Sequence, residues 1–201
     1  MSAEIPRRGF LGLAAAAAAG SVMPWVTGSR PAQAKAPGAE MDPAVVLADL
    51  IAGNQRYLAG GQQARSVASD EEDFTWGQAP RAVILGLGES AVPPEIIFDQ
   101  AREDLFVMGL PERGVDEHGL ASVEYATAVL GTRLVLVLGQ GQGGPSVAER
   151  SQLSNRWSNA QSSAAELAGS DPLLSKSVAS GQVKVLAGVH DLVTGKVEIL
   201  E

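Results

Sequence analysis

The stretch Ala82–Leu87, with the sequence AVILGL, decides the class of the fold. A run of this length that is apolar at nearly every position predicts a strand buried on both faces. Two further runs, Leu105–Met108 and Leu134–Leu138, have the same character. Strands buried in this way are typical of parallel sheets with helices on both sides, so the three runs predict an α/β protein.

Helical patterns stand before and between these runs. Asp42 and Pro43 are typical of a helix start, and apolar residues then recur at helical spacing as far as Leu58, before two glycines. Shorter or weaker helical patterns follow at residues 94–98, 120–130 and 146–168. The apolar runs at 183–189 and 196–200 are joined by a short turn, which predicts an antiparallel pair. We therefore expect a mostly parallel four-stranded sheet, an antiparallel edge strand and helices on both faces.

The composition excludes several classes of site. The chain has 201 residues, a net charge of -8, two His and no Cys. Without cysteine there is no disulfide, thiolate metal ligand or Cys nucleophile, and two His argue against a zinc site made of His alone. Acidic charge with 4% aromatic residues argues against a nucleic-acid surface. No run reaches the roughly 18 to 20 apolar residues that a membrane span needs.

Residues 1–34 are interpreted as a targeting segment. Arg7 and Arg8 precede Gly-Phe-Leu and a weakly apolar Ala/Gly-rich stretch, and Ala32-Gln33-Ala34 has the form of a cleavage site. The segment resembles a twin-arginine export signal, although Pro6 and Gly12 depart from the usual pattern. A membrane anchor and an ordinary secretion signal are the alternatives. The hypothesis is an exported protein, periplasmic or otherwise extracytoplasmic, with a single domain at residues 35–201.

From about Asp42 onward the chain resembles the β-class carbonic anhydrases. The matching stretches keep the family's order: Leu50–Tyr57, Val92–Gln100, Asp104–Val107, Ser122–Ala126, Leu138-Gly139 and Gly188–Glu198. The resemblance implies the family's α/β fold and the reversible hydration of CO2 to bicarbonate (carbonate dehydratase, a lyase) at a zinc ion held by Cys, His and Cys, beside an Asp–Arg pair. It also implies dimers in which the first helix packs across a partner. Here that helix carries an apolar stripe, which consists of Val46, Leu47, Leu50 and Ile51.

The family's chemical residues are replaced at every matching position. Leu87, Gln140 and Gly143 stand where the resemblance places the zinc ligands, and Glu89 and Ala91 stand where it places the Asp–Arg pair. Zinc lowers the pKa of bound water from about 15.7 to about 7, which requires a held cation. We therefore expect no metal and no intact catalytic residue. The predicted function is that of a non-catalytic homologue (a pseudoenzyme) that acts by binding or assembly.

Three further hypotheses stay open. A replacement metal site would need Glu89, His118 or His190, but the segments that hold the two His are expected to lie away from the pocket, so a surface or hydrogen-bonded role is favoured for both. A carbonic anhydrase acting through an unrecognised site is the first alternative function. An exported non-catalytic homologue is also expected to form a homodimer or larger homo-oligomer, with a zinc-competent paralogue as a possible partner.

A glycine-rich stretch carries the second alternative function. Residues 139–144 match G-x-G-x-x-G between a strand and a helix through Gly139, Gly141 and Gly144, and Gly143 lies in the same stretch. Such a loop can bind a nucleotide phosphate or a smaller anion, such as bicarbonate, with backbone N–H groups. The acidic residue that a dinucleotide site needs after the next strand is absent, so a small anion is favoured over a nucleotide. A plain tight turn is the remaining interpretation.

Overall fold

The computed structural model describes residues 41–63, 79–88, 91–112, 114–141, 147–170 and 172–200. The elements in chain order are α1 (Pro43–Leu58), β1 (Ala82–Leu87), α3 (Pro94–Ile97), the 3-10 helix η3 (Arg102–Asp104), β2 (Leu105–Leu110), α4 (Glu117–Ala128), β3 (Leu134–Gly141), α5 (Val147–Ser170), α6 (Pro172–Ala179), β4 (Lys184–Asp191) and β5 (Val197–Leu200). The predicted export signal at residues 1–34 lies outside the described residues, as do Glu89, Gly143 and Gly144.

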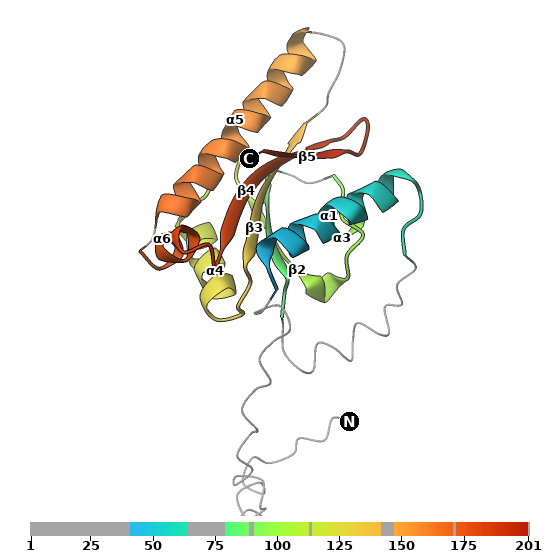
Figure 1. Ribbon diagram of the computed structural model, residues 1–201. Coiled ribbons are helices and arrows are strands. Elements are labelled where there is room, and N and C mark those ends of the chain that lie inside the picture. The colour runs from blue at the N-terminus through green and yellow to red at the C-terminus, as the bar shows by residue number, and fades with distance from the viewer. Residues whose placement is uncertain are drawn as a thin grey trace, which may run out of the picture. The chain divides into compact units, whose positions relative to one another are not determined.

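The five strands form one sheet in the order β2-β1-β3-β4-β5 (Figure 1). The first four are parallel, and β5 pairs antiparallel with β4. The predicted α/β class is therefore confirmed, together with its mostly parallel sheet and antiparallel edge strand. Because β1 and β3 are parallel neighbours with Gly86 opposite Leu138, the segments that follow both strands leave the same edge of the sheet.

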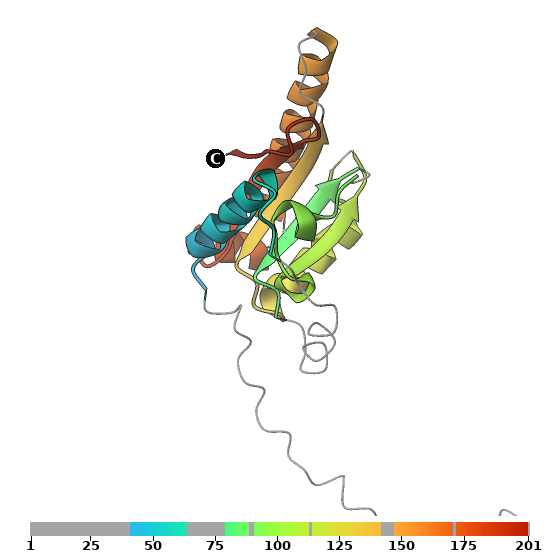
Figure 2. The same cartoon turned by 90° about the vertical axis from the view of Figure 1, so that its right-hand side faces the viewer.

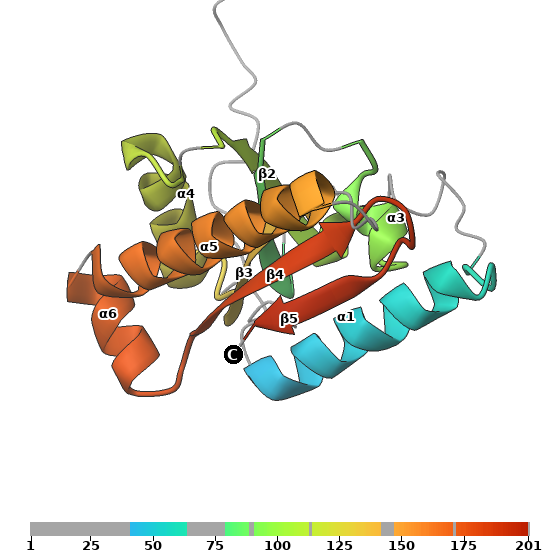
Figure 3. The ribbon, with the colours of Figure 1, turned by 90° about the horizontal axis from the view of Figure 1, so that it is seen from above.

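Helices cover both faces of the sheet. In the views of Figures 2 and 3, α1 and α3 lie on one side of the strands, whereas α5 and α6 lie on the other. The apolar residues divide in the same way: Leu50 and Ile97 pack with Ile84 and Leu136 on the first side, whereas Leu167 packs with the strands on the second. Alternate residues of a strand point to opposite faces, so each central strand contributes to both layers of the core.

The first helix has the start that its sequence predicts. Oδ1 of Asp42 accepts a hydrogen bond from the backbone N–H of Ala44 at 2.8 Å, and Pro43 occupies the first turn, where it costs no hydrogen bond. Its apolar stripe has a different use from the one expected. Val46 and Leu50 are only 1% and 2% exposed because they pack in this chain's own core, so of the four stripe residues only Ile51, at 41% exposed, has a largely exposed side chain.

Two elements were not foreseen from the sequence. The 3-10 helix η3 is a single turn, and α6 covers eight residues that begin at Pro172. Leu174 of α6 is buried and packs with Leu167 of α5, so the second helix of this pair completes the core at the end of the sheet. None of the helices in the described part of the chain is long and apolar enough to cross a membrane.

Candidate functional site

The edge of the sheet where β1 and β3 end is the place to look for a site. In α/β proteins with parallel strands, ligands bind beyond the carboxyl ends of the strands. Leu87 ends β1, and Gln140 lies next to last in β3. The sequence positions that the resemblance singled out are therefore brought to one edge, as far as the structure describes them.

Leu87 belongs to the core. Its side chain is 4% exposed and packs among Leu110, Val123 and Val137, on the face of the sheet that α5 covers. A leucine has no atom that can bind a metal ion, and its surroundings are apolar. The position that would supply the first thiolate thus contributes to packing.

The backbone beyond Leu87 is covered by a charged side chain. Gly88 has a positive φ of 78°, and a Cβ placed on it would lie 3.0 Å from Cγ of Glu112. Oε1 of Glu112 in turn forms an ion pair with Nη1 of Arg156 on α5, at 2.6 Å. The end of β1 therefore lies against the ion pair that joins Glu112, in the segment after β2, to Arg156 of α5.

Gln140 holds the loop that follows β1. The backbone N–H of Ala91 donates a hydrogen bond to Oε1 of Gln140, at 3.2 Å. This contact joins the end of β3 to the segment between β1 and α3, and it occupies the oxygen that would be the one side-chain donor atom left for a metal. Ala91 takes part only through its backbone, so the described part of the loop carries no arginine beside this position.

Residues 87, 91 and 140 do not fit a zinc ion. They offer one neutral amide oxygen, which already accepts a hydrogen bond, where a zinc site needs three or four nitrogen, sulfur or carboxylate ligands. Within the described ranges, no group of three or more His, Cys, Asp or Glu lies close enough to hold a metal ion. Glu89 and Gly143 lie outside these ranges, and Gly143 has no side chain to contribute.

The two histidines have different surroundings. His118 lies in the first turn of α4 with an exposed side chain, as the sequence analysis favoured. His190 corrects the expectation that it lies away from the strand ends: it is in β4, directly opposite Gln140 of β3. Strand β4 continues to Asp191, two residues beyond the apolar run seen in the sequence, so His190 belongs to the strand.

His190 is a buried histidine with no hydrogen-bond partner among the described residues. Its exposure is 1%, and neither Nδ1 nor Nε2 is bonded there. Burial lowers the pKa of His190 below its ordinary value of 6.5, and the Asp191 carboxylate acts in the opposite direction with a smaller effect. His190 is therefore a neutral imidazole near pH 7, beside Gln140, which stands at a position where the resemblance places a zinc ligand.

The glycine-rich stretch is partly strand. Gly139 and Gly141 belong to β3, so only the rest of residues 139–144 is available for a loop, and that part lies outside the described residues. A Cβ on Gly139 would lie 3.2 Å from the carbonyl oxygen of Arg156 and 3.6 Å from Cβ of Ala160, both on α5. The close approach of α5 to β3 favours glycine here, a role the sequence pattern alone does not distinguish from anion binding.

Three polar residues that sequence reasoning left without a role hold α1 over the sheet. Asn54 donates to the carbonyl oxygens of Ile97 and Gly195, at 3.1 and 3.0 Å, and accepts from the backbone N–H of Val197 at 3.0 Å. It thereby ties α1 to α3 and to β5 at once. The only signal for this role was that a polar residue interrupts the apolar face of a helix.

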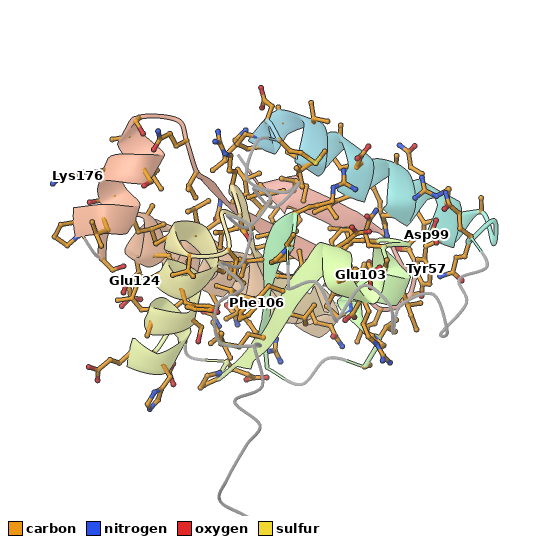
Figure 4. All side chains as sticks on the ribbon, turned by 90° about the horizontal axis from the view of Figure 1, so that it is seen from below. Tyr57, Asp99, Glu103, Phe106, Glu124 and Lys176 are labelled. Carbon is orange, nitrogen blue, oxygen red and sulfur yellow. The ribbon has the colours of Figure 1, made fainter. Side chains whose placement is uncertain are left out.

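Arg56 and Asp99 make the second connection. Arg56 forms an ion pair with Asp99, whose side chain is 3% exposed and whose φ of 47° is unusual for a residue other than glycine. Oδ1 of Asp99 also accepts from the backbone N–H of Gln63, at 3.0 Å. In Figure 4, Asp99 lies near Tyr57, at one end of α1, so this ion pair fixes the end of the helix opposite Pro43.

The chain resembles several carbonic anhydrases in sequence. No family model matches the chain. Carbonic anhydrase 2 of Mycobacterium tuberculosis is 40% identical over 99 residues, which is 49% of this chain and 48% of the relative. The carbonic anhydrase of Mycolicibacterium smegmatis is 37% identical over 99 residues, with the same coverage, and that of Pseudomonas aeruginosa is 25% identical over 77% of this chain and 88% of its own length. The alignment thus spans about half the length of the two mycobacterial relatives.

The solved structures agree on the fold. A tetrameric β-carbonic anhydrase of Sordaria macrospora superposes with a TM-score of 0.58 at 15% identity, over 78% of this chain and 94% of its own. A Coccomyxa β-carbonic anhydrase, determined in complex with acetazolamide, gives 0.54 at 19% identity over 77% and 86%. The fold is therefore that of the β-carbonic anhydrases. In sequence, the chain is similar to the two mycobacterial carbonic anhydrases over 99 residues.

Proposed function

We propose that this protein is a β-carbonic anhydrase homologue that has lost the zinc site and the Asp–Arg pair and acts by binding or assembly. The main support for the proposal is that two of the positions where the family holds zinc carry side chains with structural contacts. Leu87 packs in the core, and Oε1 of Gln140 bonds the backbone of Ala91. Each of these two side chains therefore contacts other parts of the protein where the family's side chains hold the metal.

The chemistry of the lost reaction supports the same conclusion. Hydration of CO2 by a zinc enzyme depends on a metal-bound water that ionises near pH 7, and free water does not ionise there. Among the described residues at this edge of the sheet, Gln140 and Ala91 cannot ionise, and the Glu112 carboxylate is paired with Arg156. His190 could act as a base, but its imidazole is 1% exposed and so has no access to a water that attacks CO2.

The decisive experiment measures zinc and CO2 hydration together. We expect the purified protein to contain well under one zinc per chain and to leave the rate of CO2 hydration at that of the buffer. Stoichiometric zinc, or hydration that a chelator abolishes, would overturn the proposal. That outcome would favour the second candidate, a carbonic anhydrase that acts through another site, for which the 40% identity to a curated carbonic anhydrase is the supporting observation.

Restoring the ligands separates loss of metal from loss of chemistry. The triple variant Leu87→Cys, Gln140→His, Gly143→Cys is expected to recover zinc, since a Cys2His site can contribute on the order of 10 kcal/mol when preformed. Activity should follow only after Glu89→Asp and Ala91→Arg are added, because neighbouring groups orient the ligands. The matched control is Gln140→His alone, which breaks the bond to Ala91 without supplying a thiolate and should bind little zinc.

Anion binding has less support from the geometry than from the sequence. Gly139 and Gly141 are strand residues, and the carbonyl oxygen of Gly141 accepts from the N–H of Leu192 at 2.9 Å, so neither belongs to a free loop. Titration with bicarbonate, followed by calorimetry, would reveal a site at the remaining glycines. Absence of heat at millimolar bicarbonate would leave assembly as the favoured role.

Export by the twin-arginine route is part of the proposal. It rests on Arg7, Arg8 and the low hydrophobicity of the stretch that follows them. Replacing both arginines with lysine should leave the precursor in the cytoplasm, because the charge is kept while the guanidinium groups are lost. Undiminished processing after Ala34 in the double variant would instead indicate an ordinary secretion channel. A zinc-competent paralogue encoded nearby would support a partner-subunit role for the exported protein.

A further inference from the structure

His190 lies on the face of the sheet that α1 and α3 cover. Gly188, two residues earlier in β4, has its Cβ direction toward Leu136 and Ile199, which belong to the core cluster on that side. Alternation along a strand places the side chain of His190 on the same face. Its strand neighbours are Gln140 of β3 and Val197 of β5.

The covering layer is tied to the sheet right beside His190. The backbone N–H of Val197, the β5 partner of His190, donates to Oδ1 of Asn54 on α1, at 3.0 Å. The same asparagine bonds the carbonyl oxygen of Ile97 at the end of α3. A change that pushes neighbouring groups away from the imidazole therefore strains the Asn54 hydrogen bonds that hold α1 and α3 over the sheet.

A neutral imidazole suits this place and a charged one does not. His190 is 1% exposed, and within the described part of the chain both of its ring nitrogens lack hydrogen-bond partners. Both nitrogens of an imidazolium carry protons and need acceptors or water. A charge buried without a partner is strongly unfavourable, so the ring must either stay neutral or reach solvent.

Several charged groups on the surrounding elements are already engaged. On α1 and after α3, Arg56 and Asp99 pair with each other. The ammonium of Lys196, just before β5, pairs with Glu198 of β5 at 2.8 Å. On β4 itself, Oδ1 of Asp191 accepts from the N–H groups of Val193 and Thr194, at 2.8 and 3.2 Å. The strand neighbour on β3, Gln140, is neutral, and the Asp191 carboxylate compensates a charge on His190 only in part.

We propose that His190 is an acid-sensitive latch: a proton taken from solvent by its ring opens the α1 and α3 layer over the ends of β3 and β4. The side covered by α4, α5 and α6 stays packed, because the imidazole does not face it. The sign follows from burial. The closed form binds the proton more weakly than the open form, so the free energy that favours closure has its full value above pH 6.5 and decreases as the pH falls below that value.

Amide hydrogen exchange on the full chain, between about pH 7.5 and pH 5, tests the latch. The protection factor of the Val197 amide reports the layer held by Asn54, and that of the Leu130 amide, bonded to the carbonyl of Tyr125 at 3.2 Å, reports the opposite side. One proton allows a loss of at most tenfold per pH unit, and we expect roughly that loss at Val197 below the ordinary His value. Protection at Leu130 should change by less than about twofold.

Two variants assign the effect to one residue. His190→Phe keeps a ring of similar size without a proton site and should make the protection of Val197 independent of pH. His118→Phe, which removes the exposed histidine, should leave the wild-type loss in place. Equal loss at Val197 and Leu130 in the wild-type chain, or persistence of the loss in His190→Phe, would overturn the proposal. If His190→Phe does not fold, the comparison of the two amides in the wild-type chain still decides the question.

Discussion

At the scale of single residues, the polar side chains of this protein act mainly as connections. Gln140 joins β3 to the loop after β1, Arg56 joins α1 to Asp99, and Asn54 joins α1 to both α3 and β5. In each case one side chain reaches a backbone or a charge far away in the sequence. A protein that uses such groups for structure has fewer of them left for chemistry.

Asn54 should be the most costly of these residues to lose. Replacing it with alanine removes three hydrogen bonds and leaves two carbonyl oxygens and one N–H group without this partner. We expect Asn54→Ala to lower the free energy of unfolding by about 2–4 kcal/mol, measured by urea denaturation.

The matched control is Asn159→Ala on α5. Asn159 is exposed, and the hydrogen bond that its side chain donates to the carbonyl oxygen of Glu112 is 3.5 Å long. This variant should stay within about 0.5 kcal/mol of the wild-type chain. Equal effects of the two substitutions would show that Asn54 is not the connection described above.

Single residues also mark how far the sequence could predict the site. Leu87, Ala91 and Gln140 could be placed by their motifs, because the order of motifs along the chain is visible in the sequence. The neighbourhood of His190 could not, because strand register depends on packing between segments fifty residues apart. Gly139 was placed in a loop since glycines are typical of turns, whereas the structure uses it where α5 approaches β3.

At the scale of elements, the approach of α1 to the segment after α3 sets the geometry of the covering layer. A Cβ on Gly53 would lie 1.7 Å from the carbonyl oxygen of Phe98, a distance at which one of the two backbones must move. Helix α1 can therefore reach its position only with glycine at this point. The strand runs and the start of α1 were predictable because their signals are local, while this approach is a property of two elements together.

Gly53→Ala is expected to destabilise the protein by at least about 3 kcal/mol, as overpacking against backbone allows little relief. Gly169→Ala on α5 is its control, because a Cβ there meets nothing within 4 Å. Since alanine is the better helix former, that variant should gain about 0.5–1 kcal/mol. Thermal unfolding of both variants, followed by circular dichroism, checks the difference in sign. A neutral Gly53→Ala would mean that α1 is free to shift.

At the scale of the whole molecule, the fold leads us to expect that the chain associates with copies of itself. The Sordaria macrospora protein with this fold is a tetramer. In the present chain, α1 exposes Val45, Ile51 and Leu58, at 51%, 41% and 45%, after its other apolar residues are used for the core. We expect at least a homodimer at micromolar concentration, with these side chains in the interface.

Sedimentation velocity of residues 35–201 measures this directly. Ile51→Glu should raise the monomer fraction, because a carboxylate buried in an apolar interface lacks a partner. Val129→Glu is the control: Val129 is 66% exposed just after α4, on the other side of the sheet. A wild-type protein that sediments as a monomer would contradict the expectation and weaken the partner-subunit role.

The bond between Asn54 and Val197 also has a consequence for synthesis on the ribosome. The two residues are 143 positions apart, so the helix made first can be fastened only after the last strand has left the exit tunnel. At typical rates of translation the helix waits on the order of ten seconds for this bond, longer than it waits for the apolar residues of β1 and β3 on which it packs. During that time a chaperone that holds nascent chains would have α1 as its natural target.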